Sequence, residues 1–355
     1  MPYTPHSATR RYLAWLPCIA ALVALVLATD FEASTAAPAN GVTAAQRATW
    51  QADFHRPDTT PYPDDNPYSP AKVELGHKLF FDPVLSGSGK LACASCHKPN
   101  LSWTDGRKTA EGEQEMATHT PTLLDIAWID IMGWDGHFPS LEKVAFGPIN
   151  NPAIMNRKTE DLLAALRANP NYIQAFAEAF PGQPISRETI EQALATFERM
   201  IVASPAPFDR WIAGDEAAID ASAKRGFDLF NGKAGCAECH SGWNFTDGAF
   251  YDIGVGQGDD IGRAKLFPNS PKLRYAFKVP TLRDVARRAP YMHNGSEPDL
   301  ASVIELYNQG GVDRPSRSEL IKPLNLTAQD KADLIAFLKT LTSDPKPIAV
   351  SELPH

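Results

Sequence analysis

One five-residue pattern occurs twice in this chain of 355 residues, and it limits what the chain can fold around. Residues 93–97 read Cys-Ala-Ser-Cys-His, and residues 236–240 read Cys-Ala-Glu-Cys-His. Two thiols about one helical turn apart can each form a thioether with a haem vinyl group, while the next imidazole binds the iron. The pattern is therefore the attachment signal of a c-type haem. We expect two covalently bound haems, one held by Cys93, Cys96 and His97 and the other by Cys236, Cys239 and His240.

Other uses of paired cysteines fit this pattern less well. A thioredoxin-like dithiol and half of a zinc site both need two cysteines at this spacing, but neither needs a histidine directly after them. The fifth cysteine, Cys18, lies apart from both pairs, so the chain does not resemble a disulfide scaffold. Covalent haem is the interpretation that uses every defined position of both motifs.

The residues that follow the two motifs repeat as well. Thr-Asp-Gly occurs at residues 104–106 and again at 246–248, and Pro-Thr-Leu occurs at 121–123 and again at 280–282. The second copy is longer between its motif and the Pro-Thr-Leu block. We assign the extra residues to the glycine-rich stretch 251–271.

Each copy ends in a segment with helical periodicity. Residues 186–200 begin with the capping sequence Ser-Arg-Glu-Thr and place apolar side chains on one face, and residues 327–341 have a similar periodicity. Strand-like alternation is scarce. We therefore predict an all-α fold of two tandem cytochrome c-like domains, each with one covalently bound c-type haem. Their expected bounds are 71–205 and 206–345, followed by a tail at 346–355.

The N-terminal region carries the features of an export signal. Two arginines precede an apolar run at 13–28, small residues follow it, and the pattern predicts a signal peptide over 1–37. A retained membrane anchor is the alternative, because the run approaches the length of a spanning helix. Residues 38–70 are rich in proline and lack an apolar period, so we expect extended chain there. Export predicts a periplasmic location, with no membrane segment in the mature form.

The net charge narrows the choice of partners. The chain has 34 Lys plus Arg against 42 Asp plus Glu, which gives −8. An acidic protein is repelled by a phosphate backbone instead of releasing its counterions. We therefore expect no nucleic acid partner.

Alignment of the two copies predicts that the two irons differ. Tyr307 of the second copy stands at the position of Pro148 in the first. A phenol can ligate ferric iron, whereas proline offers no donor. If this position faces the iron in both domains, the second haem is closed and the first is open to a ligand such as peroxide. Packing in the core is the alternative for Tyr307, and Met292 is a rival ligand.

On these residues the chain resembles the bacterial di-haem cytochrome c peroxidase and MauG family. The resemblance implies that peroxide reacts at the N-terminal haem, that the C-terminal haem relays oxidising equivalents, and that Trp134 lies between them. Tyr307 stands where peroxidases of the family usually have Met, which favours the MauG-like branch and suggests Trp134, Pro148 and Tyr307 as catalytic residues. Further motifs that carry the resemblance lie at 79–83, 134–136, 147–148, 278–283 and 290–295.

The MauG-like branch uses hydrogen peroxide to withdraw electrons from Trp or Tyr side chains of a partner protein. The resemblance therefore implies an exported haem-dependent oxidoreductase with a periplasmic partner protein. Similarity to a methanobactin-associated subgroup suggests that this partner is associated with copper. Two alternatives stay open: a cytochrome c peroxidase that scavenges peroxide with electrons from a small redox protein, and a non-enzymatic di-haem electron shuttle.

The chain departs from the family at three positions. Val144 and Ile154 stand where the family commonly has Gln and Glu, and a carboxylate there would carry a proton between the peroxide oxygens. Loss of that acid supports the shuttle. His119 stands where the family's calcium site takes an Asn side chain. The resemblance nevertheless implies a calcium ion between the haems.

Overall fold

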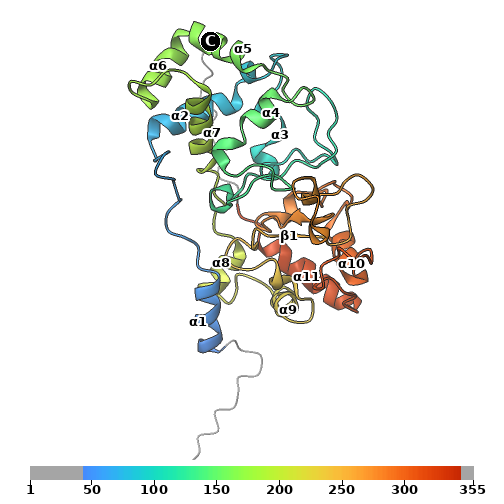
Figure 1. Ribbon diagram of the computed structural model, residues 1–355. Coiled ribbons are helices and arrows are strands. Elements are labelled where there is room, and N and C mark those ends of the chain that lie inside the picture. Colours follow the sequence, from blue (N-terminus) through green and yellow to red (C-terminus); the bar gives the residue numbers. More distant parts are fainter. Residues whose placement is uncertain (1–42, 345–355) are drawn as a thin grey trace, which may run out of the picture. The chain divides into compact units, whose positions relative to one another are not determined.

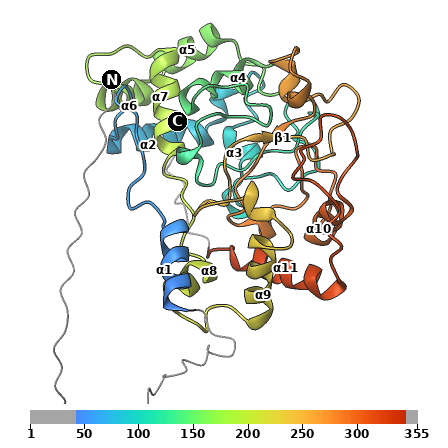
Figure 2. The same ribbon diagram turned by 60° about the horizontal axis from the view of Figure 1, so that its bottom comes forward.

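Figures 1 and 2 show a chain built almost wholly from helices and loops, as the sequence predicts. This computed structural model describes residues 43–344, so the expected signal peptide at 1–37 and the tail at 346–355 lie outside the described residues. The strands of the described part are β1 (Phe250–Tyr251) and β2 (Phe277–Lys278), which pair antiparallel. Within residues 43–344, none of the helices combines the length and apolar character needed to cross a bilayer.

The helices follow one order in each copy of the repeat, with a long helix before the haem motif and another at the end. A helix that precedes both copies is α1 (Ala44–Asp53). The first copy contains α2 (Pro70–Phe81), α3 (Cys93–Cys96), α4 (Phe146–Asn150), α5 (Thr159–Ala168), α6 (Pro170–Ala179) and α7 (Arg187–Glu198). The second contains α8 (Pro207–Ile212), α9 (Ala221–Asn231), α10 (Leu300–Gln309) and α11 (Ala328–Thr340).

The two terminal helices begin where their capping residues predict. The Ser186 side chain accepts a hydrogen bond from the backbone N–H of Thr189 at the start of α7. Thr327 does the same for the N–H of Asp330 at the start of α11. Each cap satisfies a backbone donor that has no partner within its helix. The helices expected at 186–200 and 327–341 are thus confirmed, with both ends within a few residues.

Two glycines let the long helices of each copy cross at close range. Helix α2 packs on α7, and α9 packs on α11. A Cβ atom at Gly76 would lie 2.0 Å from the carbonyl oxygen of Ala193, and one at Gly226 would lie 2.0 Å from that of Asp333. No side chain fits in that space, so glycine is required for the two backbones to meet. The same contact in both copies is the structural counterpart of the sequence repeat.

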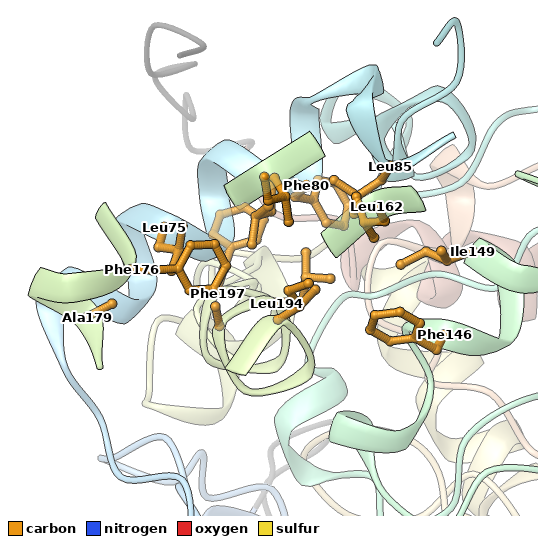
Figure 3. Packing of buried hydrophobic residues seen from close by; sticks show 14 of the residues in the cluster. Leu75, Phe80, Leu85, Phe146, Ile149, Leu162, Phe176, Ala179, Leu194 and Phe197 are labelled. Carbon is orange, nitrogen blue, oxygen red and sulfur yellow. The ribbon is translucent and has the colours of Figure 1, made fainter. Parts of the chain in front are cut away.

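The first copy buries one large apolar cluster. Figure 3 shows side chains of α2, α4, α5, α6 and α7 meeting there. Leu79, Phe80 and Ile149 have no exposed surface, and Cys93 of the haem motif packs against the same cluster. The motif is therefore anchored to the core that the crossing helices build.

Helix α1 corrects one expectation. Residues 38–70 were expected to be extended, but residues 44–53 form a helix that packs on the second copy. The Trp50 ring lies 5.3 Å from Trp211 and 4.9 Å from Phe227, and Phe54 lies 5.2 Å from Phe208, between ring centroids. Two aromatic residues four positions apart share a helix face, which is how both reach the same cluster. Residues 55–69 contain neither helix nor strand.

A pair of matched aspartates ties each copy together. Asp125 and Asp284 both have a left-handed backbone, with φ of 57° and 56°. Asp125 accepts a hydrogen bond from the N–H of Ala203, and Asp284 accepts one from the N–H of Ser343, in each case just beyond the terminal helix. Asp284 also accepts from the hydroxyl of Ser102 in the first copy, at 3.1 Å. These bonds fix the loop after each haem motif and join the two copies.

The close helix crossing generates a stability prediction. Gly76→Ala and Gly226→Ala should each lower the free energy of unfolding by at least about 1 kcal/mol, because the added methyl group must push two backbones apart. The thermal unfolding midpoint of the haem-loaded protein measures this loss. Gly182→Asn is the control, because its position has open space and Asn tolerates the left-handed φ of 75°. Equal midpoints for the control and the two alanine variants would contradict the role of the crossing.

Candidate functional site

The two haem-motif histidines are held in the same way. The Nδ1 atom of His97 lies 3.1 Å from the carbonyl oxygen of Trp103, and that of His240 lies 2.9 Å from the carbonyl oxygen of Phe245. Both carbonyls belong to residues with positive φ, 63° at Trp103 and 52° at Phe245. A carbonyl only accepts, so each Nδ1 carries the proton and each Nε2 keeps a lone pair for a metal.

The four motif cysteines are available for thioether bonds. None of them forms a disulfide. Cys93 and Cys96 bound the single turn of α3, and Cys236 begins a short 3-10 helix that ends at Glu238. Burial raises the pKa of Cys236 to about 12 and lowers the pKa of His240. The donor set and its surroundings fit a covalently attached haem.

A cavity lies beside the second motif and is lined largely by apolar side chains. Cys236, Cys239 and His240 stand on its wall, and α10 and α11 contribute others. A flat apolar group of haem type suits such a space. The apolar lining from the two helices consists of Leu300, Val303, Ile304, Leu334 and Leu338.

Tyr307 projects from α10 into this same cavity. Burial raises the pKa of its phenol, and the nearby thiols of Cys236 and Cys239 raise it further. The structure therefore brings Tyr307 to the second haem motif. Met292, the rival ligand, also lines the cavity, so both candidates lie at this site.

Trp134 joins the two copies at the edge of the cavity. Its indole Nε1–H donates to the carbonyl oxygen of His119 at 2.8 Å, and its own carbonyl oxygen accepts from the N–H of Lys278 at 2.8 Å. His119 belongs to the first copy and Lys278 to the second. Trp134 is thus linked by one hydrogen bond to His119 of the first copy and by another to Lys278 of the second.

Apolar residues and one buried carboxyl group lie in the part of the first copy that holds its motif. Pro148 lies in α4, Val144 packs on one small apolar cluster, and Ile154 packs on the large one. Sequence reasoning missed Glu198 at the end of α7, whose charge acts on the thiol of Cys93. Burial raises the pKa of this carboxyl group to about 8. Nothing in the sequence pattern of α7 distinguishes Glu198 from a surface residue.

The side chain of His119 does not supply the oxygen ligand that an Asn side chain would give a calcium ion. Its ring Nδ1 donates to the carbonyl oxygen of Arg107 at 2.6 Å, and its backbone carbonyl accepts from Trp134. Across the described residues, no group of three or more His, Cys, Asp or Glu side chains is arranged to hold a metal. Calcium takes about six to eight oxygen ligands, and a ring nitrogen is not among them.

Two cations in the cavity were also missed. Lys278 and Arg288 both line it, and burial lowers the pKa of Lys278 to about 8 and that of Arg288 to about 10. His293 also lines the cavity, and its Nε2 lies 2.6 Å from Asp260 Oδ2. The sequence shows Arg288 only as one of two adjacent arginines, so it gives no signal of burial.

Comparison with known proteins supports the haem assignment. Residues 70–217 match the family described as di-haem cytochrome c peroxidase, and residues 223–342 match the cytochrome c family. The two tandem cytochrome c-type domains are thereby confirmed. The expected boundary at 205 and 206 stays a prediction.

Three relatives illustrate the range of the family. The methylamine utilization protein MauG of Methylorubrum extorquens is 47% identical over 311 residues, covering 86% of this chain and 88% of the relative. The cytochrome-c peroxidase IdrP1 of Pseudomonas sp. strain SCT is 36% identical, covering 83% and 88%. A crystal structure of a MauG-like protein associated with microbial copper homeostasis is 31% identical, with a TM-score of 0.76 and coverage of 82% and 96%.

These likenesses extend over most of both chains, and the two haem motifs fall one in each matched domain. The fold, the two haem motifs and the sequence identity therefore indicate the same family. The chain belongs to the di-haem cytochrome c peroxidase and MauG family, haem-dependent oxidoreductases with two c-type haems.

Proposed function

We propose that this protein uses hydrogen peroxide at an open first haem to oxidise aromatic side chains of a partner protein, with Tyr307 as a ligand of the second haem. The observation that carries the proposal is the place of Tyr307. Its side chain enters the cavity whose wall carries Cys236, Cys239 and His240. The matched residue in the first copy, Pro148, has no donor atom to offer.

The difference between Tyr307 and Pro148 separates the roles of the two sites. A haem with a free coordination position can bind and reduce peroxide, and a second haem with an anionic ligand is stabilised in its oxidised form. Val144 and Ile154 are apolar and supply no ligand near Pro148. On this proposal the first haem would keep a coordination position for peroxide, and the phenol of Tyr307 would occupy that position at the second.

The redox balance requires two electrons from outside the protein. Reduction of one hydrogen peroxide to two waters takes two electrons and two protons. Covalent modification of a Trp or Tyr side chain by a two-electron oxidation releases two electrons and two protons, which is what this reduction consumes. We assign the electron relay to Trp134, and its hydrogen bonds to His119 of the first copy and Lys278 of the second support this role.

The kind of partner follows from the relatives. One is named for methylamine utilization and another is associated with copper homeostasis, and both are MauG or MauG-like. We propose that the partner is an exported protein, such as a copper-associated one, and that it binds this chain in the periplasm. The signal peptide expected at 1–37, on which export depends, lies outside the described residues.

A second candidate is peroxide scavenging. The IdrP1 relative is named a cytochrome-c peroxidase, and it covers nearly as much of the chain as MauG does. In that case the electrons come from a small redox protein that is later reduced again. The third candidate, an electron shuttle, requires both irons to have two protein ligands, which Pro148 does not favour.

Tyr307→Phe tests the ligand. Both haems should stay attached, because the cysteines are unchanged, while the optical and EPR spectrum of the second ferric haem shifts. Peroxide-dependent oxidation of the partner should fall by about tenfold or more, which corresponds to about 1.4 kcal/mol or more in the barrier. Met292→Leu is the matched control and should leave the spectrum unchanged. A shift in Met292→Leu with none in Tyr307→Phe would assign the ligand to Met292.

His97→Ala tests which haem meets peroxide. Removal of its imidazole should abolish the spectral change that peroxide causes at the first haem. The mass of the intact protein should show that both haems are still covalently attached. Retention of that change would mean that the two sites are assigned the wrong way round. His240→Ala should instead alter the spectrum of the second haem.

Mass spectrometry of the partner separates the first two candidates. After peroxide treatment with this enzyme, a modified substrate should carry a permanent mass change on a Trp or Tyr residue. A scavenging peroxidase leaves its electron donor at its original mass. Omission of peroxide is the control, and an unchanged donor that is merely oxidised would favour scavenging.

A further inference from the structure

We propose that the guanidinium of Arg288 supplies the positive charge between the two haem sites and that no calcium ion is bound there. The inference rests on the two haem sites and not on the proposed substrate. It concerns the cavity beside Trp134, where a calcium ion was expected from the family resemblance.

The charged residues that line this cavity are all basic. Lys278, Arg288 and Lys322 stand on its wall, and no Asp or Glu does so among the described residues. A divalent cation in such a space meets like charges and lacks carboxylate ligands. A haem carries two carboxylates of its own, and basic groups stabilise them.

Arg288 lines the cavity together with His119 of the first copy and His240 of the second motif, and it is 7% exposed. Its Nη2–H donates to the carbonyl oxygen of Thr281 at 2.6 Å, which fixes the guanidinium. Its Nε–H is buried and has no hydrogen-bond partner among the described residues. A buried donor without a partner needs an acceptor, and a haem carboxylate would be one.

The side-chain oxygens available near His119 are few. Two of them, Asp105 Oδ2 and Thr120 Oγ1, are buried without a hydrogen-bond partner in the described part of the chain. Together they supply two of the about six to eight oxygens that calcium takes, and no carboxylate of residues 43–344 lines the cavity itself.

A fixed positive charge beside a haem has a measurable consequence. It stabilises the reduced iron, which carries one positive charge fewer, and so raises the reduction potential. A bound calcium ion would act in the same direction but could be removed by a chelator. A chelator does not remove the charge of Arg288. The response of the haem potential to a chelator therefore distinguishes Arg288 from a calcium ion as the source of the charge.

The first measurement is the metal content of the wild-type di-haem protein. After desalting into chelator-free buffer, plasma mass spectrometry should find far less than one calcium for every two haem irons. EGTA should change neither the ferric spectrum nor the potential of either haem. One calcium per two irons, lost to EGTA together with a spectral change, would overturn the proposal.

The second measurement is the reduction potential of Arg288 variants. Arg288→Met should lower the potential of the second haem, and Arg288→Lys, which keeps the charge, should stay near the wild type. Arg287→Met is the matched control, because the neighbouring arginine does not line the cavity. If Arg288→Met keeps both haems and the wild-type potential, the proposal fails. If Arg288→Met loses a haem, the calcium content of the wild-type protein decides. One calcium for every two haem irons would then overturn the proposal.

Discussion

A single type of hydrogen bond organises both haem sites, the bond from histidine Nδ1 to a backbone carbonyl. At His97 the acceptor is Trp103 and at His240 it is Phe245, two matched residues that share a left-handed backbone. The bond sets the tautomer, and the tautomer leaves Nε2 for the iron. The rest of each site is built around this fixed imidazole.

The two sites differ although they share this bond. The first is embedded in an apolar cluster, with Pro148 in a helix of the same copy. The second faces a cavity that receives the phenol of Tyr307 and the charges of Lys278 and Arg288. One scaffold therefore offers an apolar site beside one with a phenol and basic groups.

Sequence patterns predicted structure correctly where the interactions that form it join residues close together in the chain. The capping sequence at Ser186 predicted the start of α7, and periodicity predicted α11, because both signals depend on residues three or four positions apart. The helix at 44–53 was missed, because it is stabilised by aromatic residues more than a hundred positions away. The burial of Arg288 and Glu198 was missed for the same reason. Neither residue differs in sequence from a solvated charge.

The sequence by itself determined the two haem motifs, the repeat, the helical class and the family, because each depends on spacing or identity along the chain. The place of Tyr307 beside the second motif was expected from the alignment of the copies, and the structure brings the two together. Only the tertiary structure decided which residues surround them. It placed Trp134 between His119 and Lys278 and made the cavity basic, because burial and charge depend on neighbours that are distant in sequence.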